Sequence, residues 1–455
     1  MKADLTIFRA SILHFSKAMD GANVSPDYFD DGALVVSGDR IVAVGHFKAL
    51  NAQYKCSLEH DFSGKLIIPG LIDSHLHFPQ TEMIAKYGEQ LLSWLETYTF
   101  PTERKFDDPT YCQFIAQHFI AQLINNGTTT AFAFPSVHTQ SVDALFSQAS
   151  KHNMSMISGK VCMDRNCPEF LQDTPETAQQ LSHELIEKWH EKGRNLYALT
   201  PRFAPTSTDK QLSLLGELSQ QHPSVFLQTH LSENHGEIAW VKSLFPQHNT
   251  YLDVYDRYNM VHSRSLFGHC LHLHEQEWER LADTGASAIF CPSSNLFLGS
   301  GLFSLEQAQK YKVNVSLATD VGAGTSFNML KTYGDAYKIS QLQQCPLSAI
   351  QGLYMMSQGP ACAYNLDHEI GNLNPGTYAD FVVLNPYSNA MSDLRFESLS
   401  RYRSEGAANT TEGIALSEDM LFALAFIGDD RAIEATYVAG VDLKQQLKEQ
   451  RYALA

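Results

Sequence analysis

The feature that most limits the possible folds of this sequence is a regular alternation of short apolar runs with longer helix-like stretches. Eight runs predict strands. They are the run that ends at His75 and His77, followed by residues 128–134, 154–161, 196–200, 225–230, 265–269, 286–290 and 313–320. Alternating β and α elements imply a parallel sheet, and eight strands suggest a closed barrel. We therefore predict an α/β fold in which residues 68–373 form a TIM-like (β/α)8 barrel.

Both ends of the chain are rich in predicted strands instead. Apolar runs at residues 5–8, 32–36 and 40–45 are separated by turn residues, and similar runs return at residues 379–384 and 433–441. We predict that residues 1–67 and 374–455 pair into a small β-sandwich module that the barrel interrupts. Residues 388–419 are polar, with many Ser, Arg and Glu, and are predicted to be the most mobile part of the chain.

Composition excludes several classes of function. The 455-residue chain has a formal net charge of −17, which argues against a nucleic-acid surface. No run approaches the roughly 18 apolar residues that a membrane span needs, and the start of the chain lacks an export signal. None of the eight cysteines has Cys-x-x-Cys spacing. We expect a cytoplasmic protein with reduced thiols and with neither a nucleic-acid nor a membrane partner.

His75 and His77 follow the apolar run at residues 66–72, which we interpret as one buried strand with an irregularity at Pro69-Gly70. Residues two apart in a strand point to the same face, so the two imidazoles would converge on one point. Such a pair suits a zinc-type ion if other segments complete the coordination. Taken alone, a His-x-His motif is as compatible with two hydrogen-bonded histidines at a strand end.

Other predicted strands also end in side chains that bind metals. His230, His269 and Asp320 each close an apolar run, as His75 and His77 do. The catalytic groups of a (β/α)8 barrel lie at the carboxyl ends of its strands. Separate core histidines would not follow strand ends in this way, so the pattern predicts one metal site.

This arrangement resembles the amidohydrolase superfamily of metal-dependent hydrolases, and the resemblance spans nearly the whole chain. It implies that His75, His77 and His230 bind a metal ion, and that His269 and Asp320 complete a mononuclear deaminase-type site. Whether His269 binds the ion or contacts only water and substrate stays open. Binuclear members often bridge two metals with a modified lysine at a strand end. The fourth strand here ends in Thr-Pro-Arg-Phe at residues 200–203, and Lys160 lies on the third strand, so one ion per subunit is favoured. The ligands suit Zn²⁺ and also accept Fe²⁺.

Glu233 lies three residues after His230, where active-site loops of a barrel begin. Zinc lowers the pKa of its bound water to about 7 and so provides hydroxide at neutral pH. Asp320 can accept the proton of that water, and Glu233 can carry protons to a ring nitrogen and to a leaving amine. The alternative for Glu233 is a surface carboxylate that caps a helix.

Within the superfamily, four segments resemble the guanine deaminase family. They are residues 73–80, 91–103, 200–203 and 319–326, of which the stretch from Trp94 to Glu103 is the most discriminating. The resemblance implies a homodimer that hydrolyses guanine to xanthine and ammonia through attack of hydroxide on C2. The first alternative is a related deaminase or dechlorinase that acts on another purine, a pterin or a triazine. The second is a metal-binding scaffold without catalysis.

Five residues are candidates for substrate contacts. The guanidinium fork of Arg202 matches the neighbouring O6 and N7 acceptors of guanine, and Phe203 offers an aromatic face. The amide of Gln80 can read another purine edge. Trp94 and Phe100 are expected to line or cover the pocket. The alternatives are a structural salt bridge for Arg202 and ordinary core packing for the two aromatic residues.

Overall fold

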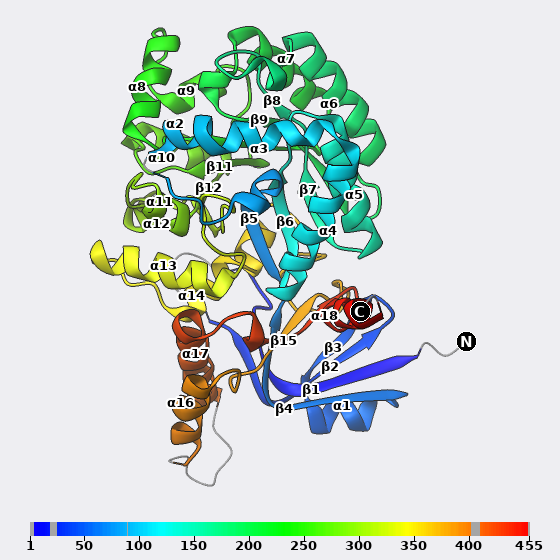
Figure 1. Cartoon of the computed structure of the whole chain (residues 1–455). Coiled ribbons are helices and arrows are strands. Elements are labelled where there is room, and N and C mark those ends of the chain that lie inside the picture. Colours follow the sequence, from blue (N-terminus) through cyan, green and yellow to red (C-terminus); the bar gives the residue numbers. More distant parts are fainter. Residues whose placement is uncertain (1–3, 19–24, 89, 402–409, 454–455) are drawn as a thin grey trace.

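The computed structural model describes residues 4–18, 25–88, 90–401 and 410–453, which form a barrel and a separate sheet built from both chain ends (Figure 1). The barrel strands are hydrogen-bonded in the order β13-β12-β11-β10-β9-β7-β6-β5, and each paired neighbour is parallel. They are β5 (Leu71–His77), β6 (Thr128–Phe134), β7 (Ser155–Ser158), β9 (Asn195–Pro201), β10 (Phe226–Leu231), β11 (Ser265–His269), β12 (Ser287–Phe290) and β13 (Asn314–Leu317). The short β8 (Val161–Cys162) pairs with β9. The predicted eight-stranded barrel is confirmed.

The barrel is nearly closed where its first and last strands meet. The amide of Asp320 donates to the carbonyl of His75 at 2.9 Å, and the amide of His77 donates to the carbonyl of Val321 at 2.5 Å. An apolar layer inside the barrel takes side chains from the successive strands or their immediate ends. It contains Ile72, Phe132, Ile157, Ala198, Phe226, Leu266, Ile289 and Ala318. This packed layer explains why apolar runs of this length recur through the sequence.

Helices cover the outside of the barrel (Figure 1). The principal ones are α4 (Pro109–Asn125), α5 (Thr139–Lys151), α6 (Pro175–Trp189), α7 (Asp209–Gln221), α8 (His235–Leu244), α10 (Glu275–Thr284), α12 (Leu305–Tyr311) and α13 (Met329–Leu342). Shorter ones are α9 (Tyr251–Asp256), α11 (Pro292–Phe297), α14 (Ala349–Met355) and α15 (Gln358–Ala363). Between β5 and α4 the chain is helical in η1 (Phe78–Met83), α2 (Leu91–Trp94), η2 (Leu95–Thr99), α3 (Phe100–Glu103) and η3 (Arg104–Asp107). No helix among the described residues is both long and apolar enough to cross a membrane.

The chain ends form a second sheet, in the order β16-β15-β14-β4-β1-β2-β3. Its strands are β1 (Leu5–His14), β2 (Asp27–Ser37), β3 (Arg40–His46), β4 (Leu58–Pro69), β14 (Phe381–Leu384), β15 (Ile433–Val438) and β16 (Val441–Asp442). The antiparallel pair of β4 and β14 joins the amino-terminal strands to the carboxy-terminal ones, as expected for a module made from both ends. The predicted β-sandwich differs from the structure, because hydrogen bonds join all seven strands into one continuous sheet. The helices α1 (Phe47–Gln53) and α18 (Leu443–Ala453) flank this sheet.

One predicted strand is in fact two. The apolar run at residues 66–72 divides at Gly70, where β4 of the terminal sheet ends and β5 of the barrel begins. The amide of Gly70 donates to Asp380 of the terminal module, and the next amide, of Leu71, donates to Gly127 of the barrel. A Cβ atom at Gly70 would lie 2.2 Å from Oγ1 of Thr129, so only glycine fits this corner. The domain boundary that we propose near residue 67 lies beside it.

The polar segment at residues 388–419, which the sequence predicts to be the most mobile part of the chain, contains parts of two helices. Helix α16 (Ala390–Arg401) and the first part of α17 (Thr410–Ile427) belong to it, while residues 402–409 lie outside the described part of the chain. The two helices form a projection beside the terminal sheet (Figure 1). Helix α17 packs against α13, with the rings of Tyr337 and Phe422 4.9 Å apart.

His14, in β1, is expected to make the fold sensitive to acid. Its side chain is 1% exposed, and burial lowers its pKa from 6.5 to about 4 against the opposing charge of Asp27. Between pH 6.5 and about pH 4 the unfolded chain binds more protons than the folded chain does. The free energy of unfolding therefore falls as the pH falls through this range. The loss approaches about 3 kcal/mol. Denaturant melts at pH 7 and pH 4.5 are expected to show a smaller difference for His14→Phe than for the parent. Equal differences would contradict this role.

Candidate active site

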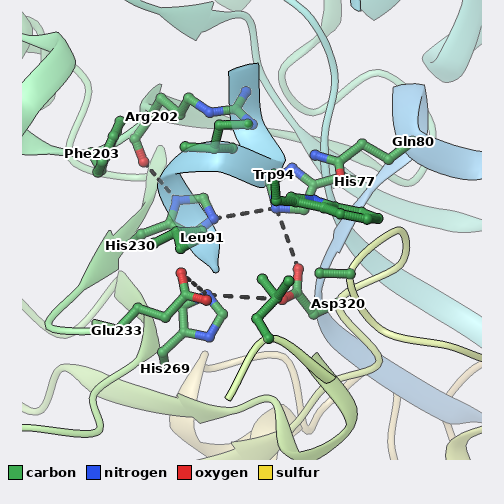
Figure 2. Close-up of a pocket in the computed structure, with 13 residues that line it drawn as sticks. His77, Gln80, Leu91, Trp94, Arg202, Phe203, His230, Glu233, His269 and Asp320 are labelled. Carbon is green, nitrogen blue, oxygen red and sulfur yellow. Dashed lines mark hydrogen bonds and ion pairs between the residues drawn. The ribbon is translucent and has the colours of Figure 1, made fainter. Parts of the chain in front are cut away.

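The carboxyl ends of three strands bring the predicted metal-binding residues together. His75 and His77 lie at the end of β5, His230 lies near the end of β10, and Asp320 follows β13. The Nε2 atom of His77 is 3.2 Å from Nε2 of His230 and 3.4 Å from Oδ1 of Asp320, and Nε2 of His75 is 3.5 Å from the same oxygen. Figure 2 shows His77, His230 and Asp320 pointing toward one another at the pocket; His75 is not drawn in it.

The protonation of the histidines suits a bound cation. Burial, followed by the neighbouring imidazoles, holds the pKa of His75 and of His230 well below the ordinary value, so both rings are neutral. Nδ1 of His230 lies 2.6 Å from the carbonyl of Arg202, which can only accept, so the free lone pair is on Nε2, the atom that faces His77. Nε2 of His75 is buried without a hydrogen-bond partner among the described residues. Neutral nitrogen lone pairs beside one carboxylate are the donor set of a zinc-type ion.

His269, the last residue of β11, stands beside this cluster. Its Nδ1 donates to Oδ1 of Asn295 at 2.9 Å, and its Nε2 is 3.3 Å from Glu233 and 3.8 Å from Asp320. Burial alone would lower the pKa of His269, but the two carboxylates outweigh it and raise the pKa. His269 and Asp320 also have positive φ angles, of 72° and 51°. Such backbone is costly outside glycine and is often retained at functional sites.

Glu233 is buried, and burial raises the pKa of its carboxyl group to about 7. One of its oxygens faces His269, and the other accepts a hydrogen bond from the hydroxyl of Ser300 at 3.3 Å. The helix-capping alternative for Glu233 is wrong, because Glu237 fills that role. The Glu237 carboxylate accepts from the amide of Glu233 at 2.8 Å and closes the capping box of α8 with Asn234. Glu233 is therefore free to face the pocket.

Four of the five candidate substrate residues line the same pocket, which Figure 2 shows in close-up. They are Gln80, Trp94, Arg202 and Phe203, joined by the apolar residues Leu91, Leu95, Leu298 and Ala323. Phe100 is not among the lining residues. It packs in the core cluster of Trp94, and its ring lies 5.7 Å from the guanidinium of Arg202.

Arg202 lines the pocket and also forms a buried ion pair. Its Nη1 atom donates to both oxygens of Glu103, at 2.8 and 3.0 Å. Arg202 is 3% exposed and Glu103 is fully buried, so the pair is almost entirely removed from water. Glu103 thereby fixes one end of the guanidinium.

Several residues that sequence reasoning missed hold the site in place. Asn295 and Ser300 position His269 and Glu233, and Asp73 accepts bonds from the amide and the hydroxyl of Thr319 across the closure of the barrel. The side chain of Gln90 donates to the carbonyl of Leu298 and accepts from the side-chain Nδ2 of Asn234. Among these residues, only Asp73 could have been noticed in the sequence, because it lies just before the His-x-His motif.

The parallel barrel, the terminal sheet and the His and Asp side chains at the strand ends define a hydrolase of the amidohydrolase class. A model of the amidohydrolase family matches residues 66–442. The chain belongs to this family, and within it to the guanine deaminases.

Three matches to guanine deaminases support this assignment. The guanine deaminase of Escherichia coli (strain K12) is 48% identical over 414 residues, which cover 91% of each protein. A solved structure of E. coli guanine deaminase superposes with a TM-score of 0.90 at 45% identity, covering 96% of this chain and 99% of the other. A guanine deaminase from C. acetobutylicum, with guanine bound in its active site, gives a TM-score of 0.84 at 29% identity and covers 96% and 100% of the two chains.

Proposed function

We propose that this protein catalyses the hydrolytic deamination of guanine to xanthine and ammonia. The observation that carries the proposal is that Glu233, His269 and Asp320 meet the histidine cluster in one pocket that Arg202 and Gln80 also line. Identity of 48% to a guanine deaminase over most of both chains supports the same substrate. Other amino-substituted heterocycles, such as pterins and triazines, are the competing substrates.

His75, His77, His230 and Asp320 would hold one metal ion, which we propose to be zinc. Fe²⁺ accepts the same ligands. When bound, such an ion lowers the pKa of water to about 7 and supplies hydroxide at neutral pH. The hydrogen bond from Nδ1 of His230 to the carbonyl of Arg202 fixes the tautomer that this role needs.

The carboxylates and His269 would handle the protons of the reaction. Asp320 takes one proton from the attacking water, whose oxygen bonds to C2 of guanine, while Glu233 gives its proton to the ring nitrogen N3. Glu233 then takes the proton of the new C2 hydroxyl and passes it to the amine, so the C2–N bond breaks, the C2 carbonyl forms and ammonia leaves. The proton held by Asp320 restores Glu233 for the next turnover. A carboxyl group with a pKa of about 7 can both give and take a proton near neutral pH. His269, whose Nε2 faces both carboxylates, keeps them oriented towards the reacting carbon.

The opposite wall of the pocket would recognise the purine. The guanidinium atoms of Arg202 that do not bind Glu103 would donate to O6 and N7. The amide of Gln80 reads a second edge, and Phe203 and Trp94 contact the faces of the ring. Phe100 does not line the pocket and would instead pack against the guanidinium of Arg202.

A substrate panel tests the choice of guanine. Zinc-loaded protein is assayed for ammonia release from guanine, adenine, an amino-pterin and an amino-triazine. We expect kcat/KM for guanine to exceed that for the others by at least about a hundredfold, because a site built to pair polar edges strongly rejects ligands that lack them. A higher kcat/KM for a pterin or a triazine would transfer the function to that class.

Ser300 is expected to position Glu233. Ser300→Ala removes the hydrogen bond to Oε1, and kcat is expected to fall about tenfold with little change in KM, because hydrogen bonds to charged groups contribute about 1.5–3 kcal/mol. Ser300→Thr keeps a hydroxyl and should restore most of kcat. Steady-state kinetics of the two variants check this, and a parent-like kcat for Ser300→Ala would remove Ser300 from the mechanism.

We also propose that the protein is a homodimer, which rests on its resemblance to the guanine deaminases. Light scattering on the purified chain should give twice the mass of one subunit, and a single-subunit mass would refute the dimer. The cytoplasmic location stays a prediction.

A further inference from the structure

A second group of side chains that could hold a metal ion lies on the outside of the barrel. His183 and Glu187 belong to α6, and His222 directly follows α7. The two helices lie side by side in the outer layer (Figure 1). His183 and Glu187 are exposed and His222 is half-buried, so an ion could reach the group from solvent. None of the three lines the catalytic pocket.

The two imidazoles are spaced as ligands of one ion would be. Nδ1 of His183 lies 3.2 Å from Nε2 of His222. Two nitrogens that each lie about 2.0–2.1 Å from a tetrahedral ion are themselves separated by about 3.3 Å. Glu187 follows His183 by four residues, which places both on one face of α6. The donor atoms of all three residues lie within 4.8 Å of one another, and a side-chain rotation of the exposed Glu187 would bring its carboxylate to the pair.

The surroundings favour a cation. His222 is the C-cap of α7, and Glu187 lies in the last turn of α6, so the partial negative charge of both helix ends faces this place. Neighbouring basic groups have other partners. Lys188 pairs with Asp143 at 2.8 Å. His190 accepts from the amide of Tyr197 through Nδ1 and bonds the hydroxyl of Ser224 through Nε2, each at 3.0 Å.

We propose that His183, Glu187 and His222 form a second, solvent-open metal site that takes a divalent transition-metal ion, with Zn²⁺ as the reference ion. Two imidazoles and one carboxylate suit such an ion, and water would complete its coordination. The ion would tie the end of α6 to the end of α7 and so stabilise this side of the barrel. The site does not depend on the proposed catalytic function. The alternative is a plain hydrogen bond in which one neutral imidazole donates to the other.

The number of zinc ions bound per chain distinguishes a second metal site from a plain hydrogen bond. Untagged full-length protein is dialysed to equilibrium against increasing free Zn²⁺, and its metal content is measured by plasma mass spectrometry. We expect the parent to bind two equivalents per chain, whereas His183→Ala and His222→Ala bind one. Glu187→Gln should weaken the second equivalent several-fold. The matched control is His118→Ala, which removes an exposed histidine of α4 outside the group and should keep both equivalents.

Thermal unfolding gives a second readout. Beyond the first equivalent, added zinc should raise the Tm of the parent and of His118→Ala but not of His183→Ala or His222→Ala, because an ion that binds only the folded state stabilises it. Without added zinc all four proteins should unfold at similar temperatures, since none of the substituted side chains is fully buried. One equivalent in the parent, or a second equivalent that survives in both histidine variants, would overturn the proposal.

Discussion

Glu233→Gln is expected to reduce guanine turnover at least about a thousandfold while the protein keeps its metal. The substitution preserves the shape of the side chain and its bond from Ser300 but removes the group that exchanges protons. General acid–base catalysis contributes about 10²–10⁴ in rate, and Glu233 would serve two proton transfers. It lies outside the proposed ligand set, so metal content should not change.

Ammonia release and metal analysis on the same sample check this result. Glu237→Gln is the structural control, because that carboxylate holds the backbone of Glu233 and the hydroxyl of Tyr251 without facing the substrate. We expect this variant to be less stable but to retain turnover within about tenfold of the parent. Near-parent turnover by Glu233→Gln, or a loss of its metal, would contradict the assigned role.

The second large effect on activity is expected at Arg202. Substitution by Lys and by Met separates its contribution to guanine binding from its contribution to stability. Arg202→Lys keeps a cation beside the buried Glu103 but loses the planar fork, so KM for guanine should rise about 10- to 100-fold with little loss of stability. Arg202→Met also leaves Glu103 buried and unpaired. Removing one partner of a buried pair costs about 3–5 kcal/mol, so this variant should also unfold at lower temperature.

Steady-state kinetics and thermal melts of the two variants test this separation. Glu103→Gln removes the charge behind Arg202 without touching the substrate side of the guanidinium, and should raise KM less than Arg202→Lys does. An unchanged KM in Arg202→Lys would remove the guanidinium from guanine recognition and leave the ion pair with Glu103 as its whole role.

The barrel and the candidate metal ligands at its strand ends could be predicted because each is a local feature of the sequence. Each strand is an apolar run, and His77, His230 and Asp320 stand where those runs end. The sequence indicated an irregularity at Pro69-Gly70 but not that the apolar run around it divides into two strands of different sheets. The packing of Thr129 against Gly70 reveals this corner.

The residues that support the site could not be predicted, because their partners are distant in sequence. Glu103 and Arg202 are 99 positions apart, and Ser300 and Glu233 are 67 apart. Neither pairing leaves a local pattern, and each exists only because the barrel brings loops from different strands to one rim. Asn295 also could not be predicted, because its hydrogen bond to His269 forms only in the folded barrel.

Removal and return of the metal tests directly whether this protein is a metal-dependent guanine deaminase. Chelated protein, freed of excess chelator, is titrated with Zn²⁺ while xanthine and ammonia are measured from guanine. We predict no turnover without metal and full recovery at one equivalent per chain in the parent, with no recovery in Asp320→Ala. Full activity of the metal-free parent, or zinc-loaded parent that forms no xanthine, would contradict a metal-dependent guanine deaminase.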